Sequence, residues 1–167
     1  SAYWTYGQKQ PKISKTKQKA ITAIEGNMST LTEMSDKIWA FEEEAFQETQ
    51  SAALLADYAE SQGFTVKRGV AGIPTAFTAE YGSGKPIIGI MGEFDALPGL
   101  SQKTVPTKDP LNEGAPGHGC GHNLFGVASL GAATAIKDLI ATGQLKGTVR
   151  FYGTTAEEKY FGKLWMV

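Results

Sequence analysis

The apolar residues in the first part of the chain repeat at helical spacing. Between about residues 21 and 41 they recur every three or four positions, which lines them along one face of a long amphipathic helix. A second helix is predicted from about Thr49 to Ser61, because Gly63 follows it and glycine is favoured just past a helix end. The acidic stretch FEEEAFQE lies between these helices, and we interpret it as a solvated surface rather than as a carboxylate cluster for a metal.

After Gly63 the pattern changes to short runs that are rich in β-branched and aromatic residues. FTVKRGV, TAFTAEY and PIIGIMGEFD are each bounded by glycine or proline, and each is predicted to be a strand. The segment IIGIM is apolar at nearly every position, which is typical of a strand that is buried on both faces. We therefore expect residues 87–91 to lie centrally in a sheet.

The rest of the chain alternates between helix and strand. A loop of Pro, Gly, Ser, Asn and Lys residues runs from Pro98 to Gly117 and is long enough to suggest a site. LFGVASLGAATAIKDLIATG then predicts a buried helix that ends at Gly143, and GTVRFYGT predicts an interior strand. This alternation indicates an α/β fold with three layers, α-β-α, around a mostly parallel central sheet.

Composition narrows the possible partners. The 167 residues suit one domain, and 16 basic against 17 acidic residues leave a net charge of −1, so we expect neither nucleic acid nor a membrane as a partner. We find no apolar run of about 18 residues and no signal peptide at the N-terminus. The chain is expected to be soluble, and a cytoplasmic location is favoured over export with a removed signal.

Three polar clusters fall where an α/β sheet would place a ligand, outside the carboxyl ends of its strands. Glu93 and Asp95 follow IIGIM, and the pair Glu157 and Glu158 follows VRFYGT. GHGCGHN, residues 117–123, stands at the head of the buried helix and holds both histidines and the single cysteine. Taken alone, the carboxylates would be a strand end and a helix start.

GHGCGHN has three interpretations, which are a metal site, a thiol nucleophile and a turn. A closed structural zinc site is disfavoured, because the stretch supplies three ligands and no second ligand pair occurs. A Cys120 thiolate beside a histidine base would resemble a cysteine hydrolase, and the following helix would lower its pKa. That mechanism leaves the carboxylates without a role, whereas a hydrolytic metal centre uses all three clusters, so we favour metal.

The stretches GEFDALPGLSQ, PGHGCGHNLFG and GTTAEE, in this order and spacing, carry a family resemblance. From about Met28 onward the chain resembles the aminoacylase and carboxypeptidase family of di-metal amidohydrolases, which are metallopeptidases. Its branch includes aminobenzoyl-glutamate hydrolases and auxin-conjugate hydrolases. The resemblance implies hydrolysis of the amide bond in N-acyl or N-aroyl amino acids or short peptides. It also implies two divalent metal ions, zinc or manganese with cobalt as a further alternative, and a homodimeric full-length protein.

The resemblance also implies roles for individual residues. Cys120, His122 and Glu158 match metal ligands. Glu157 matches the general base, which takes a proton from metal-activated water and then protonates the leaving amine. Asp95 matches an aspartate that supports a ligating imidazole. Glu93 stands where other branches have a ligand histidine, so a supporting role is expected, and His118 matches a position that is not a ligand.

Members of this family are longer than this chain and have an inserted dimerisation domain and later histidines that complete the metal sites. We therefore expect residues 1–20 to be a tail and the start of a helix, and residues 21–167 to be the N-terminal part of a catalytic domain without the inserted domain. The isolated chain is expected to bind metal weakly and to have little activity. Two alternatives stay open, a non-catalytic binding relic of the fold and a cysteine-dependent hydrolase that uses Cys120.

Overall fold

The computed structural model describes residues 13–167, so the sequence-based tail at residues 1–12 lies outside the described residues. The elements in chain order are α1 (Lys15–Gly26), α2 (Met28–Phe41), α3 (Thr49–Ser61), β1 (Thr65–Arg68), the 3-10 turn η1 (Val70–Gly72), β2 (Phe77–Ser83), β3 (Ile87–Glu93), α4 (His122–Ala141), β4 (Gly147–Thr154), α5 (Glu157–Tyr160) and α6 (Lys163–Met166). The predicted second helix, the four strands, the long loop and the buried helix are all confirmed.

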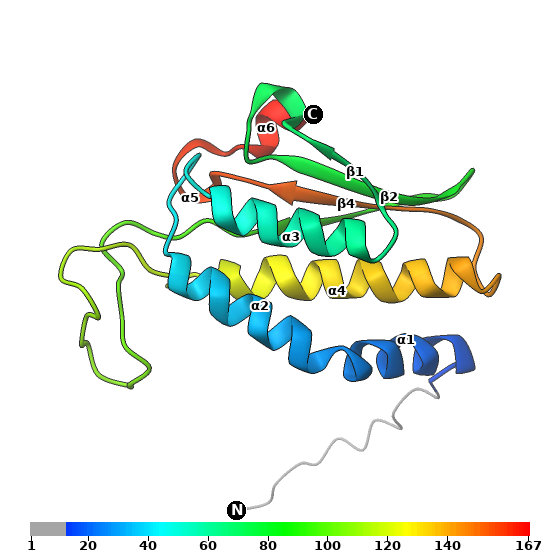
Figure 1. Ribbon diagram of the computed structural model, residues 1–167, viewed down its shortest axis with the longest axis horizontal. Helices are drawn as coiled ribbons and strands as arrows, with labels where there is room; N and C mark the ends of the chain where they lie inside the picture. Colours follow the sequence, from blue (N-terminus) through cyan, green and yellow to red (C-terminus); the bar gives the residue numbers. More distant parts are fainter. Residues whose placement is uncertain (1–12) are drawn as a thin grey trace, which may run out of the picture.

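The predicted single N-terminal helix is two helices. The first ends at Gly26, and the second begins at Met28 after Asn27, whose backbone N–H still bonds to the carbonyl of Ile24. Glycine and asparagine are both poor helix formers, so an interruption of the helix at Gly26 and Asn27 costs little helical stability. As a result, α1 and α2 meet α4 at different places along its length (Figure 1).

The α/β class is confirmed, but the sheet is mixed rather than mostly parallel. Its order is β1-β2-β4-β3, in which β2 pairs antiparallel with β1 and with β4, while β3 and β4 run parallel. The connections explain this, because residues 69–76 between β1 and β2 and residues 84–86 between β2 and β3 are too short for a crossover, so each reverses the direction of the chain. In contrast, β3 reaches β4 through α4, and such a crossover returns the chain in the same direction.

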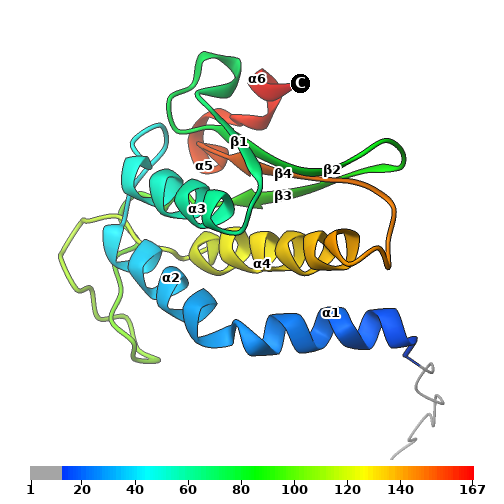
Figure 2. The same ribbon diagram turned by 45° about the vertical axis from the view of Figure 1, so that its right-hand side comes forward.

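The long helices lie on one face of the sheet. α3 and α4 pack against the strands, and α1 and α2 pack behind α4 (Figures 1 and 2). Within residues 13–167, the other face has only the short α6 and the adjoining 3-10 turn η1 (Figure 1). In the described part of the chain, the long helices therefore form two layers on the same side of the sheet, and only short helical segments lie on the other side.

The expectation that IIGIM is a central strand is also wrong. β3 is at the edge of the four-stranded sheet, and Ile87, Ile88 and Met91 are 52%, 51% and 54% exposed. The central strands are β2 and β4, each with a neighbour on both sides. The apolar composition of a strand indicates that its side chains favour burial, but it does not show whether another strand lies on each side of it.

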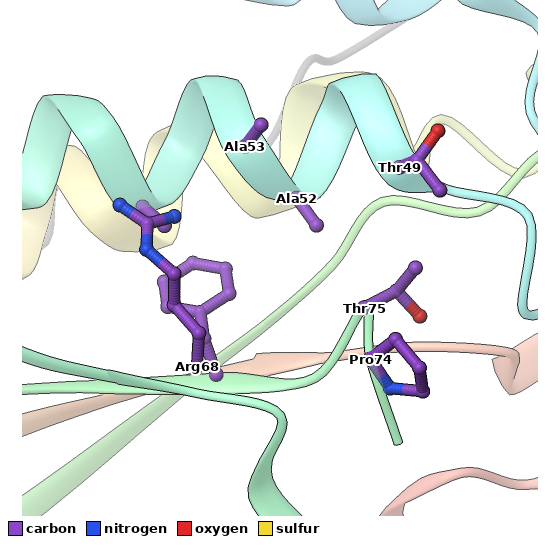
Figure 3. A pocket seen from close by; sticks show the side chains of 8 residues that line it. Thr49, Ala52, Ala53, Arg68, Pro74 and Thr75 are labelled. Carbon is purple, nitrogen blue, oxygen red and sulfur yellow. The ribbon is translucent and has the colours of Figure 1, made fainter.

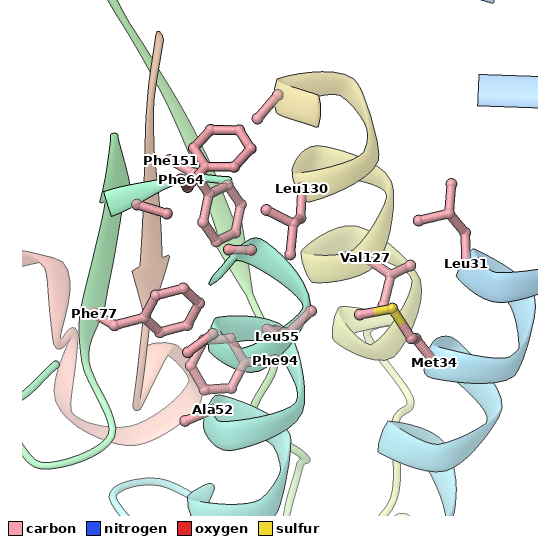
Figure 4. Close-up of a cluster of buried hydrophobic side chains, with 14 of the residues drawn as sticks. Leu31, Met34, Ala52, Leu55, Phe64, Phe77, Phe94, Val127, Leu130 and Phe151 are labelled. Carbon is pink, nitrogen blue, oxygen red and sulfur yellow. The ribbon is translucent and has the colours of Figure 1, made fainter. Parts of the chain in front are cut away.

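The hydrophobic core lies between the sheet and the α3 and α4 helices (Figure 4). The ring of Phe77 from β2 lies 5.7 Å from that of Phe151 on β4 and 6.2 Å from that of Phe94, between centroids. Leu55 of α3 and Leu130 of α4 complete this contact and are fully buried. Because Phe94 directly precedes Asp95, the core anchors the end of β3, where a polar cluster was predicted.

The helix α4 is long and apolar enough to cross a membrane by length and composition, although no such run was expected from the sequence. Its apolar character has another explanation, since it contacts β3, β4, α1 and α2 and provides part of the core. The central helix of a soluble domain can have the same length and apolar composition as a membrane span.

Gly126 of α4 allows the helix to approach the end of β3. A Cβ atom at this position would lie 2.6 Å from the carbonyl oxygen of Glu93. We therefore expect Gly126→Ala to lower the free energy of unfolding by about 1–3 kcal/mol, the usual cost of overpacking. At Gly26 of α1 nothing lies within 4 Å of the added atom, so Gly26→Ala is expected to be neutral or stabilising by up to about 1 kcal/mol. Urea unfolding of both variants tests this contrast, which equal effects would contradict.

Candidate metal centre

Sheet topology brings the three predicted polar clusters to one place. β3 and β4 are parallel neighbours, and the last residue of β3, Glu93, is in register with Thr154 at the end of β4. The segments that follow them carry Asp95 and Glu157, so these carboxylates emerge at the same edge. α4 begins with His122 directly beside this edge, since Gly126 in its second turn approaches Glu93. The crossover connection therefore assembles the cluster.

His122 is the centre of this cluster, and its side chain is only 4% exposed. Its Nδ1 atom lies 3.0 Å from Oδ1 of the buried Asp95, and its Nε2 atom lies 2.9 Å from Oε2 of Glu93. Glu158 Oε1 is 3.6 Å from Nδ1, and Glu157 Oε2 is 3.9 Å from Nε2. One imidazole thus faces four carboxyl groups, and all four belong to the predicted site residues.

The electrostatics of the cluster are dominated by negative charge. Burial alone would lower the pKa of His122, but the hydrogen bond to Asp95 and the charges of Asp95, Glu93 and Glu158 together raise it. Burial raises the pKa of Glu158, and the charge of Asp95 adds to this effect. Lys163 contacts Glu93 and neutralises part of the charge. A cation placed among these groups would relieve the remaining repulsion.

The donor atoms fit a divalent metal ion. Two groups each have their ligand atoms within 4.8 Å of one another, namely Cys120, His122 and Glu158, and Glu93, His122 and Glu157. Thiolate, imidazole and carboxylate are the ligand types that zinc and similar ions take at about 2.0–2.3 Å, so ligand atoms of one ion lie within about 4.6 Å of one another. Oε1 of Glu158 is buried without a hydrogen-bond partner, as expected of an oxygen atom that binds a metal ion.

The thiol of Cys120 has the wrong environment for a metal-free nucleophile. Desolvation and then the nearby charge of Glu158 raise the pKa of Cys120, whereas the following helix was expected to lower it. A raised pKa reduces the fraction of reactive thiolate at neutral pH. A bound cation would have the opposite effect and favour the thiolate.

His118 lies apart from both groups of candidate ligands. Its Nε2 atom is 3.0 Å from the carbonyl oxygen of Ile38 in α2, and neither group of candidate ligands includes this ring. Burial lowers the pKa of His118. The imidazole therefore ties the glycine-rich stretch to α2 in a neutral form.

Two groups near the site were not predicted from the sequence. Lys163 contacts Glu93, and no motif singles it out. The stretch FEEEAFQE is not a solvated helix face, because Glu48 is fully buried and Glu43 accepts hydrogen bonds from the backbone of Gln50 and Ser51 at the start of α3. For Glu43, the available signal was its position shortly before a predicted helix, where carboxylates cap free N–H groups. The side chain of Glu48 does not cap α3, so this signal does not extend to it.

Comparison with known proteins matches this site region to a family. The family model described as peptidase family M20/M25/M40 matches residues 89–167, which contain all seven predicted site residues. One of the subunits of p-aminobenzoyl-glutamate hydrolase from Escherichia coli K12 is 48% identical over 148 residues, which cover 87% of this chain and 30% of the relative. The chain spans about a third of the length of the curated relatives it matches.

Solved structures share the fold. The YXEP protein of Bacillus subtilis, described as a dinuclear metal binding peptidase from the M20 family, has a TM-score of 0.67 and 27% identity, covering 80% of this chain and 36% of that one. A putative aminohydrolase from methicillin-resistant Staphylococcus aureus has a TM-score of 0.74 at 24% identity, covering 89% of this chain and 38% of its own. At that identity the second likeness concerns the fold alone.

Proposed function

The chain belongs to peptidase family M20/M25/M40, and we propose that the whole protein is a metal-dependent hydrolase of amide bonds in N-acyl or N-aroyl amino acids or short peptides. One observation carries this proposal. The thiol of Cys120, the imidazole of His122 and the carboxylates of Glu157 and Glu158 meet at one sheet edge in an arrangement that fits a divalent ion. The alternative of a non-catalytic relic gives no reason for keeping Glu157 in this cluster.

We assign the metal ligands to Cys120, His122 and Glu158, for two divalent ions that are zinc or manganese, with cobalt as a further alternative. Glu93 belongs to the second group of candidate donors and is close enough to take part. A bound ion of this kind polarises an amide carbonyl and lowers the pKa of water toward neutrality. The similar Bacillus protein, which is described as dinuclear, supports the number of ions.

Glu157 is assigned as the general base and acid. Its side chain is 30% exposed, so it is open to a substrate, while its neighbour Glu158 is more buried. In this role its carboxylate removes a proton from the attacking water and later returns it to the leaving amine. Asp95 holds Nδ1 of His122 and so fixes the direction of Nε2.

Among the substrate classes, an aroyl amino acid is favoured. The relative at 48% identity is named as part of a p-aminobenzoyl-glutamate hydrolase, and most of this chain aligns with it. We further propose that the whole protein is a homodimer and that it lies in the cytoplasm. Its molar mass in solution tests the first proposal, and cell fractionation tests the second.

The whole protein should be assayed with p-aminobenzoyl-glutamate and a panel of N-acyl amino acids, before and after chelation. The proposal predicts that activity is lost with the chelator and returns with zinc or manganese. Activity that is indifferent to complete metal removal would favour the Cys120 thiol mechanism. A folded, metal-loaded protein without turnover on any member of the panel would favour the binding relic.

The isolated 167-residue chain is expected to bind zinc weakly and to have little activity. Both groups of candidate ligands share His122, whose Nδ1 is already held by Asp95, so residues 13–167 offer too few donors for two closed sites. Calorimetric titration of zinc into this chain measures the affinity. Tight binding of two ions with full turnover would contradict the expectation.

A further inference from the structure

Glu48 is a buried carboxylate next to the segment that carries Glu157. It precedes α3, its side chain is fully buried, and it has no place in the proposed metal centre. Burial of an ionisable group is costly unless it is well bonded, so its contacts indicate its role. Burial raises the pKa of Glu48, and the nearby charge of Asp95 adds to this effect.

The contacts of Glu48 lead to the segment that carries Glu157. Its Oε1 atom accepts a hydrogen bond of 2.7 Å from the backbone N–H of Ala156. Its Oε2 atom accepts one of 3.2 Å from the hydroxyl of Thr75, which in turn lies 2.8 Å from the hydroxyl of Thr155. Thr75 lies next to Pro74 on the segment before β2, across a small pocket from the start of α3 (Figure 3).

Ala156 has a backbone conformation that needs support. Its φ and ψ angles are 55° and 35°, in the left-handed region where a Cβ atom is disfavoured. This conformation turns the chain sharply at the end of β4 and starts α5 at Glu157. α5 has only four residues, so it contributes little rigidity of its own.

The other side of Glu157 is held in the same way. Oδ2 of Asp95 accepts a hydrogen bond of 2.9 Å from the backbone N–H of Glu158, while its Oδ1 holds His122. Two buried carboxylates thus bind the amides immediately before and after Glu157. Asp95 ties this segment to the imidazole, and Glu48 ties it to α3 and to the segment before β2.

We propose that Glu48 is a positioning residue for Glu157, acting through its hydrogen bond to the Ala156 amide and the left-handed turn at Ala156. This inference rests on the proposed function for Glu157. A general base must lie within hydrogen-bond reach of its water, and a displacement of about 1 Å costs up to about 100-fold in rate. Loss of Glu48 therefore acts on turnover rather than on substrate affinity.

The test uses the whole, metal-loaded protein and three variants. Glu48→Met removes the acceptor at nearly the same volume, whereas Glu48→Gln keeps a carbonyl oxygen for Ala156. Glu43→Met is the matched control, because Glu43 comes from the same acidic stretch but bonds to Gln50 and Ser51 of α3. Steady-state kinetics, bound metal and hydrogen exchange of the Ala156 amide are measured for each variant.

For Glu48→Met we expect kcat to fall about 10- to 100-fold with KM within about threefold, and exchange at Ala156 to accelerate at least about tenfold. Glu48→Gln is expected to stay within about threefold of the parent, and Glu43→Met to lower the melting temperature while sparing kcat and Ala156. Unchanged kcat or unchanged Ala156 exchange in Glu48→Met would overturn the inference, as would an equal loss of kcat in Glu43→Met. Failure of the parent protein to hydrolyse any amide would instead refute the proposed function, and Ala156 exchange would still decide the role of Glu48.

Discussion

Glu157→Gln is expected to lower kcat of the whole protein by about 10²- to 10⁴-fold, the range attributed to general acid–base catalysis. Glutamine has nearly the same shape as glutamate, but its amide neither accepts a proton from water nor returns one to the leaving amine. Glu157 is not among the three residues assigned as ligands, so the variant is expected to keep its metal. The measurements are steady-state hydrolysis of the best substrate and metal analysis of the same sample.

A matched control separates this effect from a general loss of charge. Glu113→Gln removes the same charge from an exposed position in the loop between β3 and α4, and it is expected to leave kcat unchanged. The assignment of Glu157 fails if Glu157→Gln turns over at a rate near that of the parent. A simultaneous loss of metal would instead place Glu157 among the ligands.

Cys120→Ser is expected to weaken metal binding by more than about 100-fold. Partners that merely orient a ligand already contribute about 10- to 100-fold to affinity, and loss of a ligand costs more. Cys120 is exposed, so the substitution leaves the core intact and the fold is expected to survive. Competition with a chromogenic zinc chelator measures the affinity, and circular dichroism verifies the fold.

The same variant separates the two roles of the thiol. If Cys120 is a ligand, a high concentration of zinc or manganese is expected to restore part of the activity of Cys120→Ser. If Cys120 is the nucleophile, metal at any concentration leaves the variant inactive, while its metal affinity stays near that of the parent. Cys120→Ala provides the control without an oxygen donor and is expected to recover less activity than Cys120→Ser.

The strands and the helix α4 were predictable because their apolar spacing is local information. The three polar clusters were also predictable, since a crossover through α4 must bring the ends of β3 and β4 together. The edge position of β3 was not, because strand composition reports a preference for burial and not the number of neighbours. The antiparallel pairing of β2 follows from the short connections on either side of it, whose lengths are visible in the sequence.

The residues of the candidate site could be predicted from the sequence, but the contacts that hold them in place could not. Cys120, His122 and Glu158 were singled out from their motif, whereas Glu48 was assigned to a solvated surface. Its bond to Ala156 joins residues 108 positions apart, and no periodicity connects them. The contact of Lys163 with Glu93 is likewise long-range. Such contacts depend on how the elements pack, and local sequence patterns do not reveal that packing.

The central claim is that this sheet edge is a metal centre. It is tested most directly by anomalous X-ray diffraction from crystals of the whole protein with bound zinc, recorded at the zinc absorption edge. The account predicts anomalous density in contact with Sγ of Cys120, the imidazole of His122 and the carboxylate of Glu158, with a second peak about 3.5–4 Å away. Anomalous density elsewhere, with none at these three side chains, would contradict it.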